Sequence, residues 1–328
     1  MKAADMHCDT ICELMKGDAK GSFRKNMLHI DLEKLKEGDY LLQNFAMFVN
    51  KREYNDCHKR CIEMLSYWKR ICSENSDVIG EAVCTADIIN NYKNGRISAM
   101  LTVEEGECCN GTPKGLKELY DYGVRMMTIT WNYANLLGYP AAPRCPVTGK
   151  RLAPDFTKGL TEKGRIIAEE MQRIGIIIDV SHLSDRGFYD IAEISRKNKI
   201  PFAASHSNAR KLMNNPRNLT DDMIKSIGEL GGVIGINFYP PFLLEKNPSK
   251  DRQLECLILH MRHMINKGGI DCVGLGTDFD GIDGELAVDN AGKMQKLYDA
   301  LRKSGFSELE AEHIFRKNVL RLYREVLG

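Results

Sequence analysis

The chain has 328 residues, of which 43% are hydrophobic, so it can bury a large core as one barrel-sized domain or as two smaller ones. Its 46 basic and 45 acidic residues leave a net charge of +1. This balance excludes a broad electrostatic field for nucleic acid or an anionic membrane, and it favours a small-molecule partner.

Short apolar or β-branched runs recur along the chain between longer amphipathic stretches. This alternation is typical of parallel strand–helix units, and eight such runs are enough to close a (β/α)8 barrel. Since no low-complexity tract or linker interrupts the pattern, we expect one α/β barrel domain over residues 1–328. The predicted strands are 3–9, 42–50, 97–103, 124–130, 175–180, 201–205, 232–238 and 272–277.

Helical patterns fill most of the gaps, for example over 160–175 and 183–198. The tail over 307–327 is another predicted helix, with Ser307 as its cap and Glu310 three residues later.

The first strand ends in His7-Cys8-Asp9. Because side chains alternate along a strand, His7 and Asp9 project to one side and Cys8 to the other. Two ligands from one strand end can hold one metal ion. A buried histidine bonded to an aspartate is the structural alternative.

Carboxylates follow the third predicted strand, in the run Glu104-Glu105-Gly106-Glu107. One of them could bridge two metal ions. The alternative is the start of a helix, where acidic residues interact favourably with the helix dipole, and we favour that interpretation for Glu105 and Glu107.

Two further strands end in histidines, His182 and His206, and the last ends in Asp278 and Asp280. In a barrel these side chains reach the same rim. Imidazole and carboxylate ligands suit Zn²⁺, Mn²⁺ or Fe²⁺, and a pair of such ions lowers the pKa of a shared water. For the other histidines we expect surface or helix-packing roles; these are His29, His58, His260, His263 and His313.

Eleven cysteines without a secretory signal indicate reduced thiols rather than a disulfide framework. Cys57, His58 and Cys61 resemble half of a zinc site, but they lie in a helical pattern with no second pair, so we favour a structural role. The N-terminus lacks the apolar core of a signal peptide, and no apolar run approaches the ~20 residues of a membrane span. We expect a cytoplasmic protein without membrane or nucleic-acid partners.

The histidines and carboxylates at the strand ends, with the motifs around them, resemble the renal or membrane dipeptidase family. Its members are di-zinc peptidases among the amidohydrolase-like barrels. The resemblance spans almost the whole chain. It rests on DMHCDT, VEEG, GLTEKGRIIAEEMQRIGIIIDVSH, FAASHSNAR, NPRNLTDDMI, GGVIGINFY and VGLGTDFDG.

The resemblance implies that His7 and Asp9 hold one metal ion, that Glu104 bridges, and that His182 and His206 hold the second. It also implies two substrate contacts. Asp278 would bind the substrate's amino group and carry the proton in catalysis, while Arg210 would pair with the terminal carboxylate, which its planar guanidinium suits.

The chain departs from the family where animal members carry a histidine thought to touch the substrate carbonyl. Here the segment reads Thr130-Trp131-Asn132. Asn132, Tyr133 and Tyr239 are the candidates for that role.

The resemblance implies a zinc-dependent dipeptidase that cleaves free dipeptides, including those with a C-terminal D-residue, through a hydroxide bridging two Zn²⁺ ions. Mn²⁺ or Fe²⁺ could replace zinc, and a homodimer is the candidate oligomer. One alternative is another amidohydrolase acting on N-acyl amino acids, lactams or lactones. A second alternative is a peptide-binding protein without catalysis.

Overall fold

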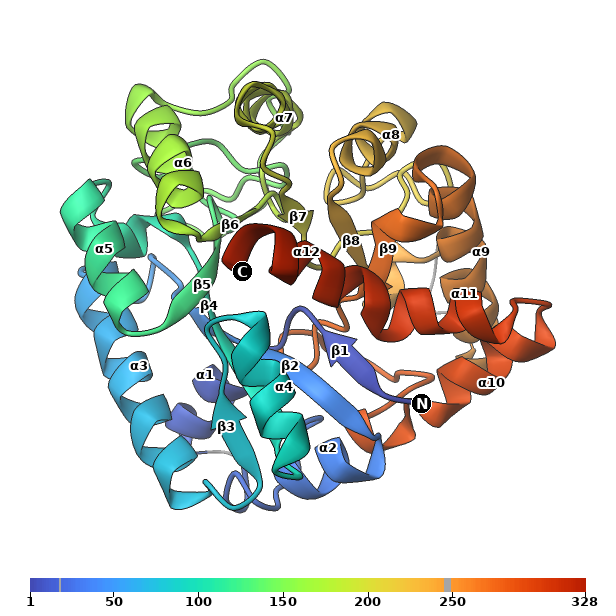
Figure 1. Ribbon diagram of the computed structural model, residues 1–328. Helices are drawn as coiled ribbons and strands as arrows, with labels where there is room; N and C mark the ends of the chain where they lie inside the picture. Colours follow the sequence, from blue (N-terminus) through green and yellow to red (C-terminus); the bar gives the residue numbers. More distant parts are fainter. Residues whose placement is uncertain (18, 245–248) are drawn as a thin grey trace.

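Eight parallel strands form a closed ring at the centre of the computed structural model, which describes residues 1–17, 19–244 and 249–328 (Figure 1). Strand β1 pairs with β2 and β9, and pairing of β2 with β4 completes the ring. The predicted (β/α)8 barrel is therefore confirmed. Its strands are β1 Ala3–Asp5, β2 Tyr40–Phe48, β4 Ile97–Glu104, β5 Val124–Thr128, β6 Ile177–Asp179, β7 Ala203–Ala204, β8 Val233–Ile236 and β9 Val273–Leu275.

A ninth strand, β3 (Ile79–Glu81), lies outside the ring and was not predicted. It pairs in parallel with the first three residues of β4, whereas β5 pairs with β4 from Leu101 onward. Three residues are too few to show the alternation by which a strand is recognised in a sequence.

Helices surround the ring of strands (Figure 1). The helices predicted over 160–175 and 183–198 are confirmed as α6 and α7, which begin after the side-chain caps Thr161 and Ser184. None of the described helices combines the length and apolarity needed to cross a membrane. The α-helices are α1 Thr10–Lys16, α2 Leu32–Glu37, α3 Cys57–Glu74, α4 Thr85–Lys93, α5 Pro113–Asp121, α6 Glu162–Ile174, α7 Asp185–Asn198, α8 Asp221–Glu229, α9 Lys250–Gly268, α10 Gln295–Lys303, α11 Glu308–Glu312 and α12 Asn318–Leu327. Short 3₁₀ turns are η1 Gly106–Cys109, η2 Pro240–Phe242, η3 Ile270–Cys272 and η4 Ala291–Lys293.

The tail is helical as predicted, with the Ser307–Glu310 capping box, but a π-helical turn, η5 (His313–Lys317), divides it into α11 and α12. Directly after this turn, the Asn318 side chain donates hydrogen bonds to the carbonyls of Ile270 in η3 and of Val273 at the start of β9, each at 2.7 Å. The last helix is thereby anchored to the barrel.

Helix α12 covers the amino-terminal end of the barrel, as Figure 1 shows. Val319, Leu322 and Tyr323 are fully buried and pack with apolar side chains of the barrel strands. The Tyr323 hydroxyl accepts a hydrogen bond from Asn44 inside the ring at 2.7 Å. Since this end is filled, the carboxyl ends of the strands are left to carry a site, as in other barrels of this kind.

Glycines allow three neighbouring strands to meet at the rim. A Cβ atom at Gly235 or Gly276 would lie 1.9 or 1.8 Å from the carbonyl oxygen of Ser205. This close approach fixes the chain just before His206.

We expect Gly276→Ala to lower the free energy of unfolding by about 1–3 kcal/mol, the usual range for overpacking, because the Ser205 carbonyl has to move. Urea denaturation would measure the change. Gly138→Ala is the matched control, since its Cβ would meet only ordinary contacts at 3.5 Å, and its effect should stay within about 0.5 kcal/mol. Equal midpoints for the two variants would contradict this account.

Candidate active site

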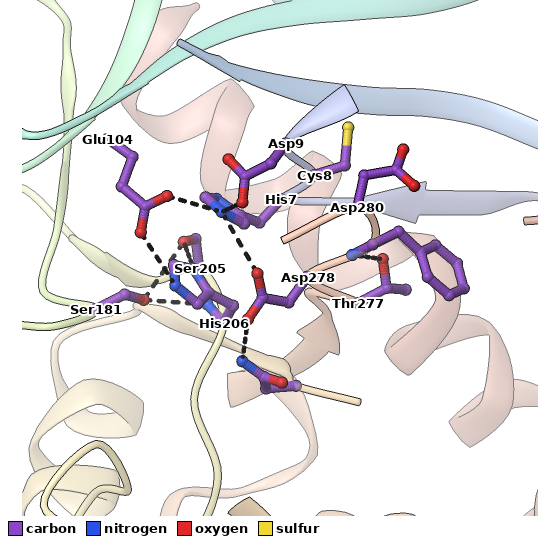
Figure 2. A network of polar contacts seen from close by, with 12 residues as sticks. His7, Cys8, Asp9, Glu104, Ser181, Ser205, His206, Thr277, Asp278 and Asp280 are labelled. Carbon is purple, nitrogen blue, oxygen red and sulfur yellow. Dashed lines mark hydrogen bonds and ion pairs between the residues drawn. The ribbon is translucent and has the colours of Figure 1, made fainter. Parts of the chain in front are cut away.

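The predicted ligands lie at the carboxyl ends of barrel strands. Figure 2 labels all of them except His182 and shows these side chains pointing toward a common centre, with Cys8 turned to the opposite side, as strand alternation predicted. The residues that converge in this view are His7, Asp9, Glu104, His206 and Asp278.

The carboxylate of Glu104 lies between the histidines. Its Oε2 is 3.3 Å from Nε2 of His7, whereas its Oε1 is 2.9 Å from Nε2 of His182 and 3.6 Å from Nε2 of His206. Each oxygen therefore faces a different set of nitrogen atoms. This is the arrangement expected of a carboxylate that bridges two cations.

Hydrogen bonds on the far side of the rings fix which nitrogen of each histidine is free. Ser205 Oγ donates to Asp179 at 2.5 Å, so it accepts from Nδ1 of His206 at 2.8 Å. The Oδ1 atom of Asn132 accepts from Nδ1 of His182 at 3.1 Å. Both Nε2 atoms then present lone pairs to the centre, as metal-binding histidines do.

The donor atoms at the centre are of the kinds that bind metal ions, and several of them lack a hydrogen-bond donor. Nε2 of His182 and Nε2 of His206 are 3.0 Å apart, so two lone pairs face each other beside a carboxylate oxygen. Nε2 of His7 and Oδ1 of Asp9 are buried without a hydrogen-bond partner among the described residues. Buried charged groups are paired or coordinate metal ions, and a cation here would satisfy both atoms.

Three overlapping groups of donors, each within 4.8 Å, could hold an ion. They are His7–Asp9–Glu104, Glu104–His182–His206 and His7–His206–Asp278.

The electrostatics of the centre favour positive charge. Burial lowers the pKa of His7, but the charges of Glu104 and Asp9 outweigh burial and hold that pKa well above its usual value. Burial lowers the pKa of His182 to about 4 and also lowers that of His206. These two histidines are therefore neutral ligands near pH 7.

Asp278 has a strained backbone conformation and lies beside the candidate metal ligands. Its φ is 63°, and that of His182 is 69°, in the left-handed region that residues other than glycine rarely adopt. Asn237 donates a 2.8 Å hydrogen bond to Asp278 Oδ2, while Oδ1 faces His7 at 3.8 Å. Burial raises the pKa of Asp278 to about 7, so this carboxyl can take up or release a proton near neutral pH.

A cavity of about 700 Å³ opens onto these residues. Asn132 and Tyr239 line it, as does Trp131, whose ring lies 4.8 Å from that of Phe48. Tyr133 is buried and is not among the lining residues.

The side chain of Arg210, which the resemblance pairs with the substrate's carboxylate, has another partner in the structure. Its guanidinium forms two hydrogen bonds with Asp185, at 2.6 and 2.7 Å, and it does not line the cavity. The side chain joins the loop after His206 to the start of α7.

Arg217, which the sequence analysis missed, lines the cavity instead. It is buried, one of its nitrogens donates to the His206 carbonyl at 3.4 Å, and its Nε has no partner among the described residues. Burial lowers its pKa to about 10. A buried guanidinium without a carboxylate partner is suited to an anionic ligand. Its place in the NPRN segment was the only sequence signal.

The remaining predictions concern side chains away from the centre. Glu105 accepts a hydrogen bond from the Glu107 amide at the start of η1, in agreement with a helix-start role. His58 contacts the Cys108 carbonyl at 2.6 Å and Glu118 at 3.2 Å, so it packs α3 against its neighbours. Asp280 accepts from Thr10 at 2.6 Å.

Comparison with known proteins identifies a family for the chain. The membrane dipeptidase family (peptidase family M19) matches residues 1–327. An uncharacterised dipeptidase of Schizosaccharomyces pombe is 33% identical over 236 residues, which are 71% of this chain and 54% of that protein.

Two solved structures share the fold. The structure of a metallopeptidase called dipeptidase AC, of family M19, superposes with a TM-score of 0.88 at 26% identity, covering 100% of this chain and 99% of that one. A metallopeptidase from Rhodobacter sphaeroides, bound to a phosphinate mimic of L-Ala-D-Ala, has a TM-score of 0.87 at 23% identity, with 99% of each chain covered. With its barrel and its match to the family over nearly the whole length, the chain belongs to the membrane dipeptidase family.

Proposed function

We propose that this protein is a metallo-dipeptidase that binds two divalent cations, zinc by preference, and hydrolyses free dipeptides. The observation that carries this proposal is the position of Glu104, whose two oxygens face separate histidines. Membership of the membrane dipeptidase family supports it.

His7 and Asp9 would hold one cation, His182 and His206 the other, with Glu104 shared between them. Two cations there would supply Lewis acidity and lower the pKa of water toward neutrality. Ser205 and Asn132 orient the rings of His206 and His182, so the ligands are held in position before substrate enters.

The two ends of a dipeptide find opposite charges in the cavity. Asp278 would bind the amino group and move the proton that the leaving amine requires. Arg217 would bind the terminal carboxylate, because it is the buried guanidinium of the cavity wall. This replaces the role first expected for Arg210.

Asn132 is the group we assign to the substrate's carbonyl oxygen. Its Oδ1 is engaged by His182, whereas its Nδ2 donates to none of the described residues and belongs to a side chain that lines the cavity. An amide donor can stabilise charge on a carbonyl oxygen during attack. Asn132 would thus serve in place of the histidine of animal relatives, which Trp131 replaces here.

The proposal extends to the stereochemistry of the substrate and to the cellular compartment. The Rhodobacter sphaeroides relative bound to a mimic of L-Ala-D-Ala supports acceptance of a C-terminal D-residue here. All eleven cysteines are free thiols, which supports a reducing compartment such as the cytoplasm.

Removal of metal with a chelator should abolish dipeptide hydrolysis, and two equivalents of Zn²⁺ per chain should restore it. His182→Ala should lower kcat/KM by at least about 100-fold and reduce the bound metal, because one cation loses a ligand. Activity assays and elemental analysis would measure both effects. His58→Ala, a histidine outside the centre, is the control. Full activity in the metal-free protein would refute the proposal.

Acetylation of the substrate's amino group should lower kcat/KM at least ~30-fold, because the charge that pairs with Asp278 is lost. L-Ala-L-Ala and L-Ala-D-Ala would be compared with their N-acetyl forms in one assay. Equal cleavage of free and blocked substrates would instead support a broader amidohydrolase.

Arg217→Met should raise KM for L-Ala-D-Ala at least ~10-fold, while Arg210→Met should change it by no more than ~3-fold. The reason is that Arg217 lines the cavity and Arg210 does not. Steady-state kinetics on the two variants, each checked for folding by circular dichroism, would separate them. A larger rise in KM for Arg210→Met than for Arg217→Met would instead assign the substrate's carboxylate to Arg210.

A further inference from the structure

We infer that the site prefers dipeptides whose C-terminal residue carries an acidic side chain, and that Arg144 and Arg151 bind this second acid group. The inference rests on the proposed dipeptidase function and names its substrate class.

The cavity wall carries more cationic side chains than one terminal carboxylate requires. Lys16, Arg144, Arg151 and Arg217 line it. Lys16 is paired with Glu13 at 2.6 Å. Among the residues that the structure describes, no carboxylate lies within 4.0 Å of the guanidinium of Arg144 or Arg151. The Arg144 guanidinium donates a hydrogen bond to the Gly149 carbonyl at 3.2 Å.

The two arginines face each other across a short turn. Arg144 and Arg151 form an antiparallel bridge, and the turn between them is held by a hydrogen bond from Arg52 to the Val147 carbonyl. Like charges directly opposite each other on paired strands destabilise the pair. An anion between the guanidinium groups would remove that cost.

Backbone contacts hold this turn against the candidate active site. The Arg144 amide donates to the Asn132 carbonyl at 2.8 Å. Asn132 is the residue whose side chain holds His182. The turn is thus fixed relative to the bond that would be cleaved.

The arginine pair lines the same cavity as Arg217, the residue proposed to bind the substrate's terminal carboxylate. Arg151 and Tyr239 both line this cavity. The Tyr239 ring lies 5.0 Å from that of Phe242, and the Arg217 guanidinium lies 5.5 Å from the same ring. A C-terminal residue with its α-carboxylate on Arg217 would direct its side chain toward this pair.

An anionic group on the protein does not already serve this purpose. Asp283 also lines the cavity. It forms no ion pair with Arg144 or Arg151 in the described part of the chain. The ligand that matches the free charges is a second carboxylate, as in C-terminal aspartate or glutamate.

The test compares L-Ala-Glu with L-Ala-Gln, in both configurations of the second residue, because these side chains differ in charge but hardly in shape. We expect kcat/KM to favour the glutamate substrate about tenfold in the wild type. Arg144→Met/Arg151→Met should bring the ratio close to one. Lys16→Met, which removes a cation already paired on the same wall, should keep the wild-type ratio.

Charge reversal supplies a second, gain-of-specificity test. Arg151 is exposed, so Arg151→Glu should fold, and it should favour L-Ala-Lys over L-Ala-Gln. A wild-type ratio near one, or a ratio unchanged in the double variant, would overturn the inference while leaving the dipeptidase proposal intact. Failure to cleave any of these dipeptides with zinc bound would overturn both.

Discussion

The carboxylate of Glu104 is the group on which the rest of the site depends. It is buried among three histidines, and each of its oxygens faces a different partner. A buried cluster of lone pairs and negative charge is stable only with cations to balance it. Glu104 ends β4, which is paired over its length with β2 on one side and with β3 and β5 on the other, so the bridging position is rigid.

The two ends of the barrel differ in composition: the amino-terminal end is packed with apolar side chains, and the carboxyl-terminal end carries the polar side chains of the candidate site. At the amino-terminal end, α12 fills the ring with apolar side chains such as Leu322. At the carboxyl-terminal end, the strands end in polar residues, and backbone strain gathers there, with positive φ at His182, Asp278 and Asp280. Strain of this kind persists only where the surrounding packing enforces it. The close contact of Gly235 and Gly276 with the Ser205 carbonyl is part of that packing.

Different parts of the chain contribute the candidate metal ligands and the arginines of the cavity wall. The metal candidates lie in or directly after strands, where geometry is least variable. The guanidinium groups of Arg144, Arg151 and Arg217 come from irregular segments between strands and helices. Loops can change without disturbing the barrel, so related enzymes with one metal centre can accept different substrates. In this chain the irregular segments present these three arginines to the cavity.

Sequence alone determined the barrel and the converging ligands, because both follow from local patterns. Apolar runs marked all eight strands of the ring, and His7, Glu104 and His206 stood out at or just beyond their ends. Only the tertiary structure distinguishes the positions of Arg210 and Arg217. Both lie in one irregular segment, closed by the Ala209–Leu219 bridge, and packing sends one to Asp185 and the other into the cavity. The periodicity of the sequence does not predict these two positions, because they depend on contacts with α7 and the cavity wall, which other parts of the chain supply.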